Sequence, residues 1–408
     1  MKKMSIMALV VILVLSFTGC SNKEMKLYSA FEKAQEITSM ESDTDITFTF
    51  NTTGFSQEEQ NSMQMVQQML KDSKISLHQK MLQNEEKTIA KAKVDADITF
   101  GGMMMNTQVW VDTDLSGKTP KLVEVIKLPP MVMAAAPEFQ NKEYIVYNFN
   151  EMMDMNQNKE VDFNKLMNVS KELQPKLTKF LRDYAGQFNP RLEMVEYKGN
   201  KSVDGKNVSV YELRLDDRSF KKLVRYAANN FLENEDALKF IKEYMTTVVD
   251  MTEAIDTEKE TAKEEMDKGF DEFKNNIPQM KENINVFMDA FEDVEVLGEN
   301  GIVIEYMINE DGYIVNEKGT IDLNIDLAKL EKAFKKVNTN KTNSVPAKNG
   351  VFKIGLNFNS KIYNINKEIE IEKPALTIEN TLYFSDMMKS AIVQTEQVET
   401  VDEGVLEQ

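Results

Sequence analysis

The sequence predicts an α+β protein in which a large antiparallel β-sheet packs on helices. Many segments near both ends of the chain alternate apolar and polar residues with a period of two, which is typical of strands with one buried face. Turn-forming pairs separate several of them, at Gly101-Gly102, Asp204-Gly205 and Asp311-Gly312. Residues 217–291 instead space their apolar side chains three and four apart, which is typical of helices.

Residues 1–19 have the form of a lipoprotein signal peptide. Two lysines precede an apolar stretch, residues 4–17, that is too short to span a membrane comfortably, and small residues lead directly to Cys20. Cleavage before Cys20 would free its amino group, so that thiol and amine could both be acylated, and two or more chains anchor a protein stably. The alternative is an uncleaved anchor with an incidental cysteine. We therefore expect residues 20–23 to be a short lipidated tether on the extracytoplasmic face of a cell membrane.

The composition excludes several classes of protein. Cys20 is the only cysteine, so a lipidated chain has no thiol left for disulfides or catalysis. The net charge of −18 becomes more negative once the two lysines of the signal are removed, which argues against nucleic acid as a partner. Because no linker rich in Gly, Ser or Pro divides the chain, we predict a single domain over residues 24–385 and an acidic flexible tail over 386–408.

The first part of the chain predicts two helices and a series of strands. Residues 24–38 fit an amphipathic helix, and residues 56–72 fit a second one with Ser56 as N-cap and Glu59 completing a capping box. Residues 88–100 form the clearest strand, because Ala, Val, Ile and Phe alternate there with Lys, Asp and Thr. The other predicted strands are residues 45–53, 74–83, 103–112, 122–128 and 144–149, and an irregular apolar loop spans 129–137.

The rest of the chain predicts a helical block between strands. We interpret residues 217–291 as a helical insertion into a β-rich domain, and we expect Asn300-Gly301 to turn the chain between two strands. The predicted helices are residues 162–187 (broken near Pro175), 217–232, 236–251, 270–291 (kinked at Pro278) and 328–337. The predicted strands are residues 192–197, 207–215, 294–297, 302–308, 313–327, 351–358, 361–371 and 377–384.

No motif in the sequence indicates catalysis, nucleotide binding or a metal site. His78 is the only histidine, and no GxSxG sequence or other nucleophile motif accompanies it. The chain has no GxGxxG or P-loop sequence, and one histidine without a free cysteine argues against zinc. We therefore predict a protein that is not an enzyme and that uses no cofactor or metal.

The chain contains 27 methionines, which suggest an adaptable apolar cavity. Their flexible and polarizable side chains suit a cavity that accepts ligands of varied shape, although they fill ordinary cores equally well. In a strand, Met103 and Met105 share one face and Met104 points to the other. The candidate lining residues are Met63, Met65, Met69, Met103, Met105, Met131 and Met133.

The layout resembles that of the LolA/LppX-type lipoproteins. An amphipathic N-terminal helix is followed by long alternating strands that continue through hairpins near residues 203–207 and 309–313, behind a lipidation sequence. The resemblance implies a strongly curved antiparallel sheet, an incomplete barrel, that wraps helices around an apolar cavity. The segments 39–50, 84–102, 109–122 and 203–217 are also similar to cell-surface lipoproteins that often carry a copper-amine-oxidase N-terminal-like stalk, which this chain lacks.

These observations lead to a membrane-anchored, non-catalytic envelope lipoprotein that binds a lipid or other hydrophobic ligand in the concave face of its sheet. The alternative is a surface interaction or scaffold lipoprotein with a solid core and a protein or cell-wall partner, and an enzyme ranks third. A cavity of roughly several hundred Å³ would favour the first. An exposed apolar patch over a filled core would favour the second. An acidic pair converging on His78 in a cleft would favour the third.

Overall fold

The computed structural model describes residues 22–117, 121–135, 142–151, 163–250, 256–337 and 349–389. Its strands are β1 (Ser39–Thr53), β2 (Lys74–Gln83), β3 (Ile89–Phe100), β4 (Met103–Asp114), β5 (Lys121–Lys127), β6 (Tyr144–Asn148), β7 (Val195–Val203), β8 (Lys206–Leu215), β9 (Leu297–Asn309), β10 (Ile314–Asp326), β11 (Val351–Tyr363) and β12 (Thr381–Tyr383). Its helices are α2 (Asn22–Ala34), α3 (Gln57–Leu70), α4 (Pro130–Ala135), α6 (Phe163–Gln187), α7 (Asp217–Glu233), α8 (Glu235–Asp250), α9 (Asp256–Ala290) and α10 (Leu327–Val337).

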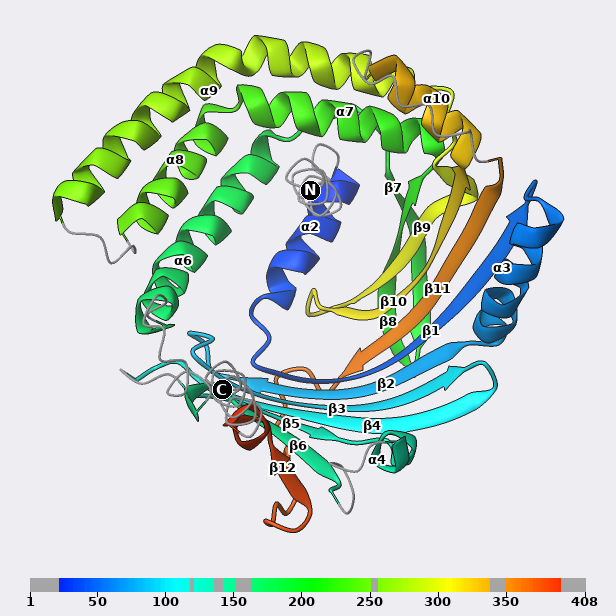
Figure 1. Ribbon diagram of the computed structural model, residues 1–408, viewed down its shortest axis with the longest axis vertical. Coiled ribbons are helices and arrows are strands. Elements are labelled where there is room, and N and C mark those ends of the chain that lie inside the picture. Colours follow the sequence, from blue (N-terminus) through cyan, green and yellow to red (C-terminus); the bar gives the residue numbers. More distant parts are fainter. Residues whose placement is uncertain are drawn as a thin grey trace, which may run out of the picture.

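The described strands form one twelve-stranded sheet in the order β12-β6-β5-β4-β3-β2-β1-β11-β10-β9-β8-β7. All neighbours run antiparallel except β12 and β6, which are parallel. The sheet curves strongly but does not close into a barrel, and α6–α9 lie across from it so that sheet and helices surround α2 (Figure 1). The predicted α+β class is therefore confirmed.

Register divides the side chains of this sheet between two faces. Ile46 on β1 lies opposite Ile75 on β2 and Phe358 on β11, whereas the next residue back, Asp45, lies opposite Ser76 and Asn359. Because antiparallel neighbours opposite each other share a face, the apolar residues line up on the concave face and most polar residues on the convex face.

Helices cover the concave face along β8, β9 and β10. Leu215, Leu297 and Ile302 of the sheet are buried there against Leu27 of α2, Phe188 of α6 and Leu223 of α7. The ring of Phe31 on α2 also meets that of Tyr306 on β9 edge to face, with centroids 5.3 Å apart. This is the largest buried cluster among the described residues, and we call it the packed core.

Two long helices are more regular than their prolines suggest. The helix α6 continues through Pro175, where the sequence predicts a break, and α9 continues from Asp256 to Ala290 with Pro278 inside it. The segment predicted as an irregular loop contains the short helix α4, and its last two residues lie outside the described part. Residues 384–389, at the start of the predicted flexible tail, are helical.

Two predicted strand boundaries are wrong. Asn300-Gly301 is not a hairpin turn, because β9 runs continuously through it and its register against β10 shifts between Ile321 and Leu323. Gly301 has φ +63°, and a Cβ there would lie 2.2 Å from the carbonyl oxygen of Leu215, so this bulge requires glycine. The two strands predicted at 351–358 and 361–371 are instead one strand, β11, which ends at Tyr363.

The segment 364–380, which we call the C-terminal strap, packs on the convex face beside β4. The indole of Trp110 donates a 2.9 Å hydrogen bond to the carbonyl oxygen of Glu372, and its ring is buried with Ile371. Asp112, two residues along β4, accepts hydrogen bonds from Lys121, at 3.0 Å, and from Lys373 of the strap. Burial alone would raise the pKa of Asp112, but these two ammonium groups outweigh it and hold the pKa below its ordinary value.

We predict that Asp112→Asn loosens the strap and destabilises the protein by about 1–2 kcal/mol, because it removes the charge that both lysines contact. Trp110 is the only tryptophan, so its emission should shift to the red as it gains contact with water. Because the pKa of Asp112 is lowered in the folded state, its carboxylate stabilises that state at neutral pH. This stabilisation is lost as the pH falls through the folded-state pKa of Asp112. Wild-type protein should therefore undergo the same spectral change in acid, below about pH 4.

The matched control is Asp114→Asn, on the same strand, whose carboxylate bonds Ser116 and no lysine. An unchanged emission spectrum in Asp112→Asn, or an equal shift in both variants, would contradict the role given to Asp112.

Candidate ligand-binding site

The concave face beyond the packed core carries a second apolar surface, which we call the open wall. It continues the inward-facing rows from β11 across β1 to β5. Its members are Ile46, Phe48, Phe50, Ile75, Leu77, Met81, Val94, Ile98, Phe100, Met103, Met105, Val109, Val111, Leu122, Ile126, Ile354, Leu356 and Phe358.

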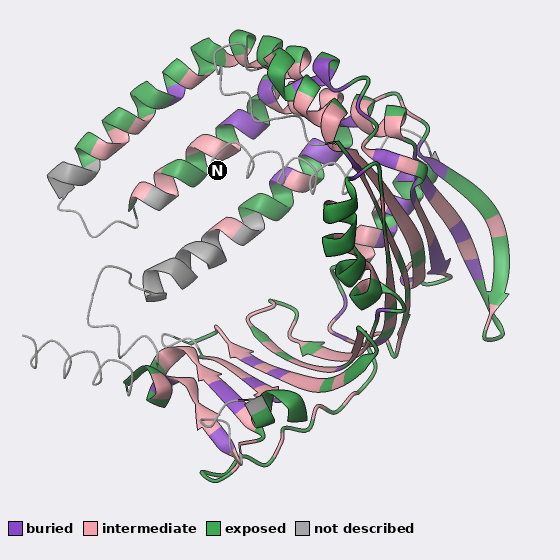
Figure 2. Cartoon of the chain, turned by 45° about the vertical axis from the view of Figure 1, so that its right-hand side comes forward, coloured by how far each residue is buried: buried purple, intermediate pink, exposed green. Residues whose placement is uncertain are grey.

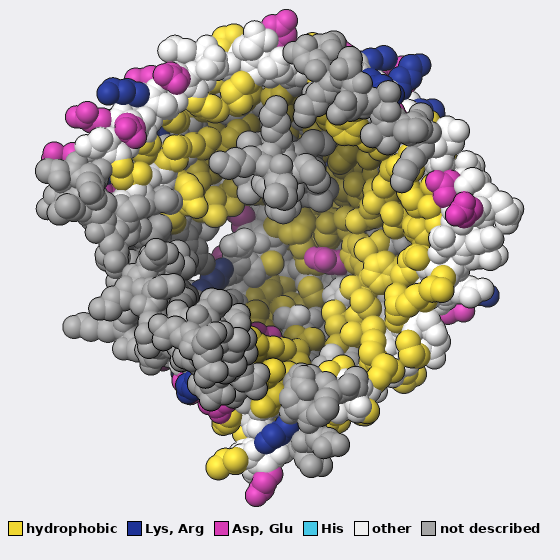
Figure 3. Space-filling view, viewed as in Figure 1, with side chains coloured by type: hydrophobic (Ala, Val, Ile, Leu, Met, Phe, Trp, Pro, Cys, Tyr) yellow, Lys and Arg dark blue, Asp and Glu magenta, His cyan; other side chains and the backbone are white. Residues whose placement is uncertain are grey.

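The side chains of the open wall are half-buried, apart from the more exposed Met103 at its end. By contrast, Leu215, on the same face in the packed core, is only 1% exposed. Figure 2 shows this difference between the buried positions of the helix-covered part and the intermediate positions along the long strands. Figure 3 shows a hollow lined by hydrophobic side chains inside the ring of sheet and helices.

A groove of about 770 Å³ opens where α3 meets the end of β1. It shares Phe48 and Phe50 with the open wall, and its other side is formed by Gln64, Gln67 and Gln68 of α3. The side-chain amide of Gln67 also donates a 2.9 Å hydrogen bond to Thr52 Oγ1 on β1. Glutamines, and not the predicted methionines of α3, therefore line this groove.

The helix α3 forms as predicted but does not bury its apolar face. Ser56 and Glu59 make both bonds of the capping box, which satisfies two backbone N–H groups at the start of the helix. Met63 is half-buried, Met65 is 68% exposed and Met69 is also exposed, and none of them lines the groove. That these three methionines line a ligand cavity stays a prediction.

The methionines of β4 alternate as expected for a strand. Met103 and Met105 lie opposite Phe100 and Ile98 of β3, on the face of the open wall. Met104 faces the other way and is 71% exposed. Met103 and Met105, two of the predicted lining residues, therefore belong to the concave face.

Exposed methionines gather at one end of the long strands, which we call the methionine rim. Its members are Met65 and Met69 on α3 and Met103 and Met104 after the β3–β4 turn, and Met131 on α4 is exposed as well. The backbone links two of these segments, since Gly101 N–H donates a 2.7 Å hydrogen bond to the carbonyl oxygen of Met69. Met133 on α4 is half-buried. The rim borders the open wall at its Met103 end.

His78 lies on the convex face with two acidic neighbours. Its Nδ1 is 2.8 Å from Asp43 Oδ1, and its Nε2 is 3.9 Å from Glu41 Oε2. Burial and a hydrogen bond with Asp43 raise the pKa of the nearby Tyr363 to about 12. Asp43 is largely exposed, and the 770 Å³ groove does not include this group. The acids that converge on His78 therefore lie on the convex face, outside this groove.

Within the described ranges, no group of three or more His, Cys, Asp or Glu side chains is placed to hold a metal ion. None of the helices in those ranges is both long and apolar enough to cross a membrane. Cys20 and the signal segment lie outside the described residues.

Comparisons with known proteins give no family for this chain. No family model matches the sequence, and no curated protein matches it. Among solved structures, a DUF1329 family protein from Desulfovibrio piger aligns over 86% of this chain and 96% of its own, with 7% identity and a TM-score of 0.20. A score this low does not establish a common fold.

Sequence reasoning missed a polar position within this site. Glu317 on β10 faces the concave side, next to Ser360 of β11 and in line with Thr44 of β1. Ile321, Leu323 and Ile325 alternate along β10, and the same alternation places residue 317 on their face. The sequence therefore contained the signal that Glu317 faces inward.

We predict that truncating the open wall costs little stability. Leu356→Ala should destabilise the protein by less than about 1 kcal/mol, because this half-buried side chain borders a hollow. Leu215→Ala, on the same face in the packed core, should cost about 2–5 kcal/mol through the cavity it leaves. Urea unfolding of both variants measures the difference, and equal large losses would mean that the open wall is part of a solid core.

Proposed function

We propose that this protein is a non-catalytic envelope lipoprotein that binds a lipid or another long apolar ligand along the open wall. The observation that supports it best is the wall itself: an apolar surface spanning six strands whose side chains are neither buried by the described helices nor fully exposed. Concave apolar surfaces of this kind are typical of ligand sites, and an extended one suits an acyl chain.

The proposed location is the outer face of a cell membrane, reached through acyl chains on Cys20. The lipidation sequence supports this, and so does α2, which begins at Asn22, two residues after that cysteine. A tether this short would keep the domain close to the bilayer. In layout, the curved open sheet around helices also agrees with the resemblance to LolA/LppX-type lipoproteins, which is an argument by analogy of fold.

A scaffold or interaction role is the second candidate, and the methionine rim favours it. Exposed apolar side chains that cluster at one edge are typical of surfaces that meet a partner. The same rim also suits ligand transfer, since it borders the open wall where a chain could enter.

Mass spectrometry of bound lipid tests the proposal. The Cys20→Ser protein, which cannot be lipidated, would be purified from a bacterial host without detergent and extracted with organic solvent. We expect about one lipid per protein and its loss in Met105→Lys, because a charge on the apolar wall is costly unless it is paired. Met104→Lys, one residue away on the opposite face, should keep the lipid.

Circular dichroism and the emission of Trp110 would show that both variants fold. Protein that carries no lipid and also fails to take up added phospholipid from vesicles would overturn the proposal. Equal loss of lipid in both variants would place the ligand away from the open wall.

A further inference from the structure

A β-bulge lets Ile314 and Glu317 of β10 both face the concave side, although they are three residues apart. Along β10, Ile314 lies opposite Ile308 of β9, and the next paired residue is Asn316, opposite Met307. Val315 packs against Met307 on the convex side, so Val315 and Asn316 both oppose one residue of β9. Such a bulge shifts the alternation by one residue. Glu317 therefore faces inward, directly opposite Tyr306 of the packed core.

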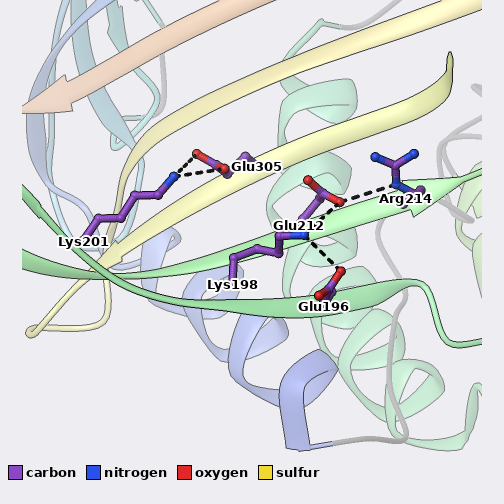
Figure 4. A network of polar contacts seen from close by, with 6 residues as sticks. All are labelled: Glu196, Lys198, Lys201, Glu212, Arg214 and Glu305. Carbon is purple, nitrogen blue, oxygen red and sulfur yellow. Dashed lines mark hydrogen bonds and ion pairs between the residues drawn. The ribbon is translucent and has the colours of Figure 1, made fainter.

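Glu317 differs from Glu305 and Glu212 on the neighbouring strands β9 and β8, which both have cationic partners. Glu305, on the convex side of β9, lies 3.1 Å from Lys318. Figure 4 shows its other partner, Lys201 at 3.4 Å, and Glu212 on β8 with Arg214 at 3.4 Å. These two lysines outweigh the effect of burial and hold the pKa of Glu305 below its ordinary value. No side chain in the described part of the chain forms an ion pair or hydrogen bond with Glu317.

The surroundings of Glu317 disfavour its charge. Burial raises the pKa of Glu317, and burial, with a smaller contribution from the Glu317 carboxyl, raises the pKa of Tyr306. A carboxylate on an apolar surface is costly unless a cation or several hydrogen-bond donors compensate for the lost water. Glu317 is thus the kind of group that a ligand with positive charge would stabilise.

Two hydroxyl groups continue the row that begins at Glu317. Ser360 of β11 lies directly opposite Glu317, and Thr44 of β1 lies directly opposite Ser360. The hydroxyls of Thr44 and Ser360 are 2.8 Å apart and partly buried. Opposite residues of neighbouring strands have Cβ atoms about 4.5–5.5 Å apart, so the three polar groups lie within one small area. Leu77, Leu356 and Phe358 of the open wall border this area.

We propose that Glu317, Ser360 and Thr44 bind the protonated amine of an amphiphile whose apolar chain lies along the open wall. A primary ammonium group has three N–H donors, and this row offers a carboxylate and two hydroxyl oxygens as acceptors. The carboxylate also supplies the opposite charge, which gives a charge-assisted hydrogen bond in an apolar setting. This inference rests on the proposed function and adds the chemical class of the head group.

Competition among three ten-carbon amphiphiles tests it. The neutral fluorophore N-phenyl-1-naphthylamine would first be bound to the Cys20→Ser protein and then displaced by decylamine, decanol or decanoate. At neutral pH we expect decylamine to displace the dye at a concentration about tenfold lower than decanol, the difference that one charge-assisted hydrogen bond gives. Decanoate should be the weakest competitor, because its charge repels Glu317.

Glu317→Gln should abolish the preference for decylamine while leaving the dye and decanol bound as before. The matched control is Glu124→Gln, since Glu124 also faces inward but lies on β5, with five strands between it and Glu317. This variant should keep the preference. Ser360→Ala retains the carboxylate and should reduce the preference for decylamine over decanol about threefold. If Glu317→Gln does not fold, the result for Ser360→Ala decides whether the amine subsite exists.

The outcomes separate the two proposals. If the dye does not bind to the wild-type domain, the open wall is not a ligand site and both proposals fail. If the dye binds but the three amphiphiles compete equally, or Glu317→Gln keeps the preference for decylamine, the ligand site remains and the amine subsite is wrong.

Discussion

The structure depends on one constraint, which is the alternation of side chains across neighbouring antiparallel strands. From β8 through β11 and β1 to β5, opposite residues stay on matching faces, so many separate apolar segments become one continuous concave surface. The helices bury this surface along β8–β10 and leave it open further on. The packed core therefore holds the fold together, whereas the described helices do not bury the remainder of the same surface.

Most individual elements could be predicted from local patterns. The register-setting turns at Gly101-Gly102 and Asp204-Gly205 have the positive φ angles that such hairpins require, and Ser56 caps its helix as expected. The errors arose where long-range contacts override a local signal. Gly301 looks like a turn but serves a bulge against the backbone of Leu215, and the exposed face of α3 has apolar residues that a helical pattern would assign to a core.

The candidate site was harder to predict than the fold, for a physical reason. Residue type could suggest an apolar cavity, but only the sheet order shows that β11 joins β1 and so makes one wall from segments about 300 residues apart in sequence. The same applies to Glu317, Ser360 and Thr44, which belong to three strands brought together by that order. Met103 and Met105 were placed correctly because their position depends only on alternation within one strand.

The pairing of β1 with β11 also bears on how the chain folds. The segment at 39–53 is made early, and its partner at 351–363 follows only after almost all of the other strands and the long helices. Until then β1 has β2 on one side and an unpaired edge on the other, and unpaired edges promote association between chains. Such non-local pairing is slow, so a nascent chain would hold this edge and its apolar face exposed for the longest time. The C-terminal third of the chain therefore ends the exposure of this edge, since β11 is the strand that pairs with it.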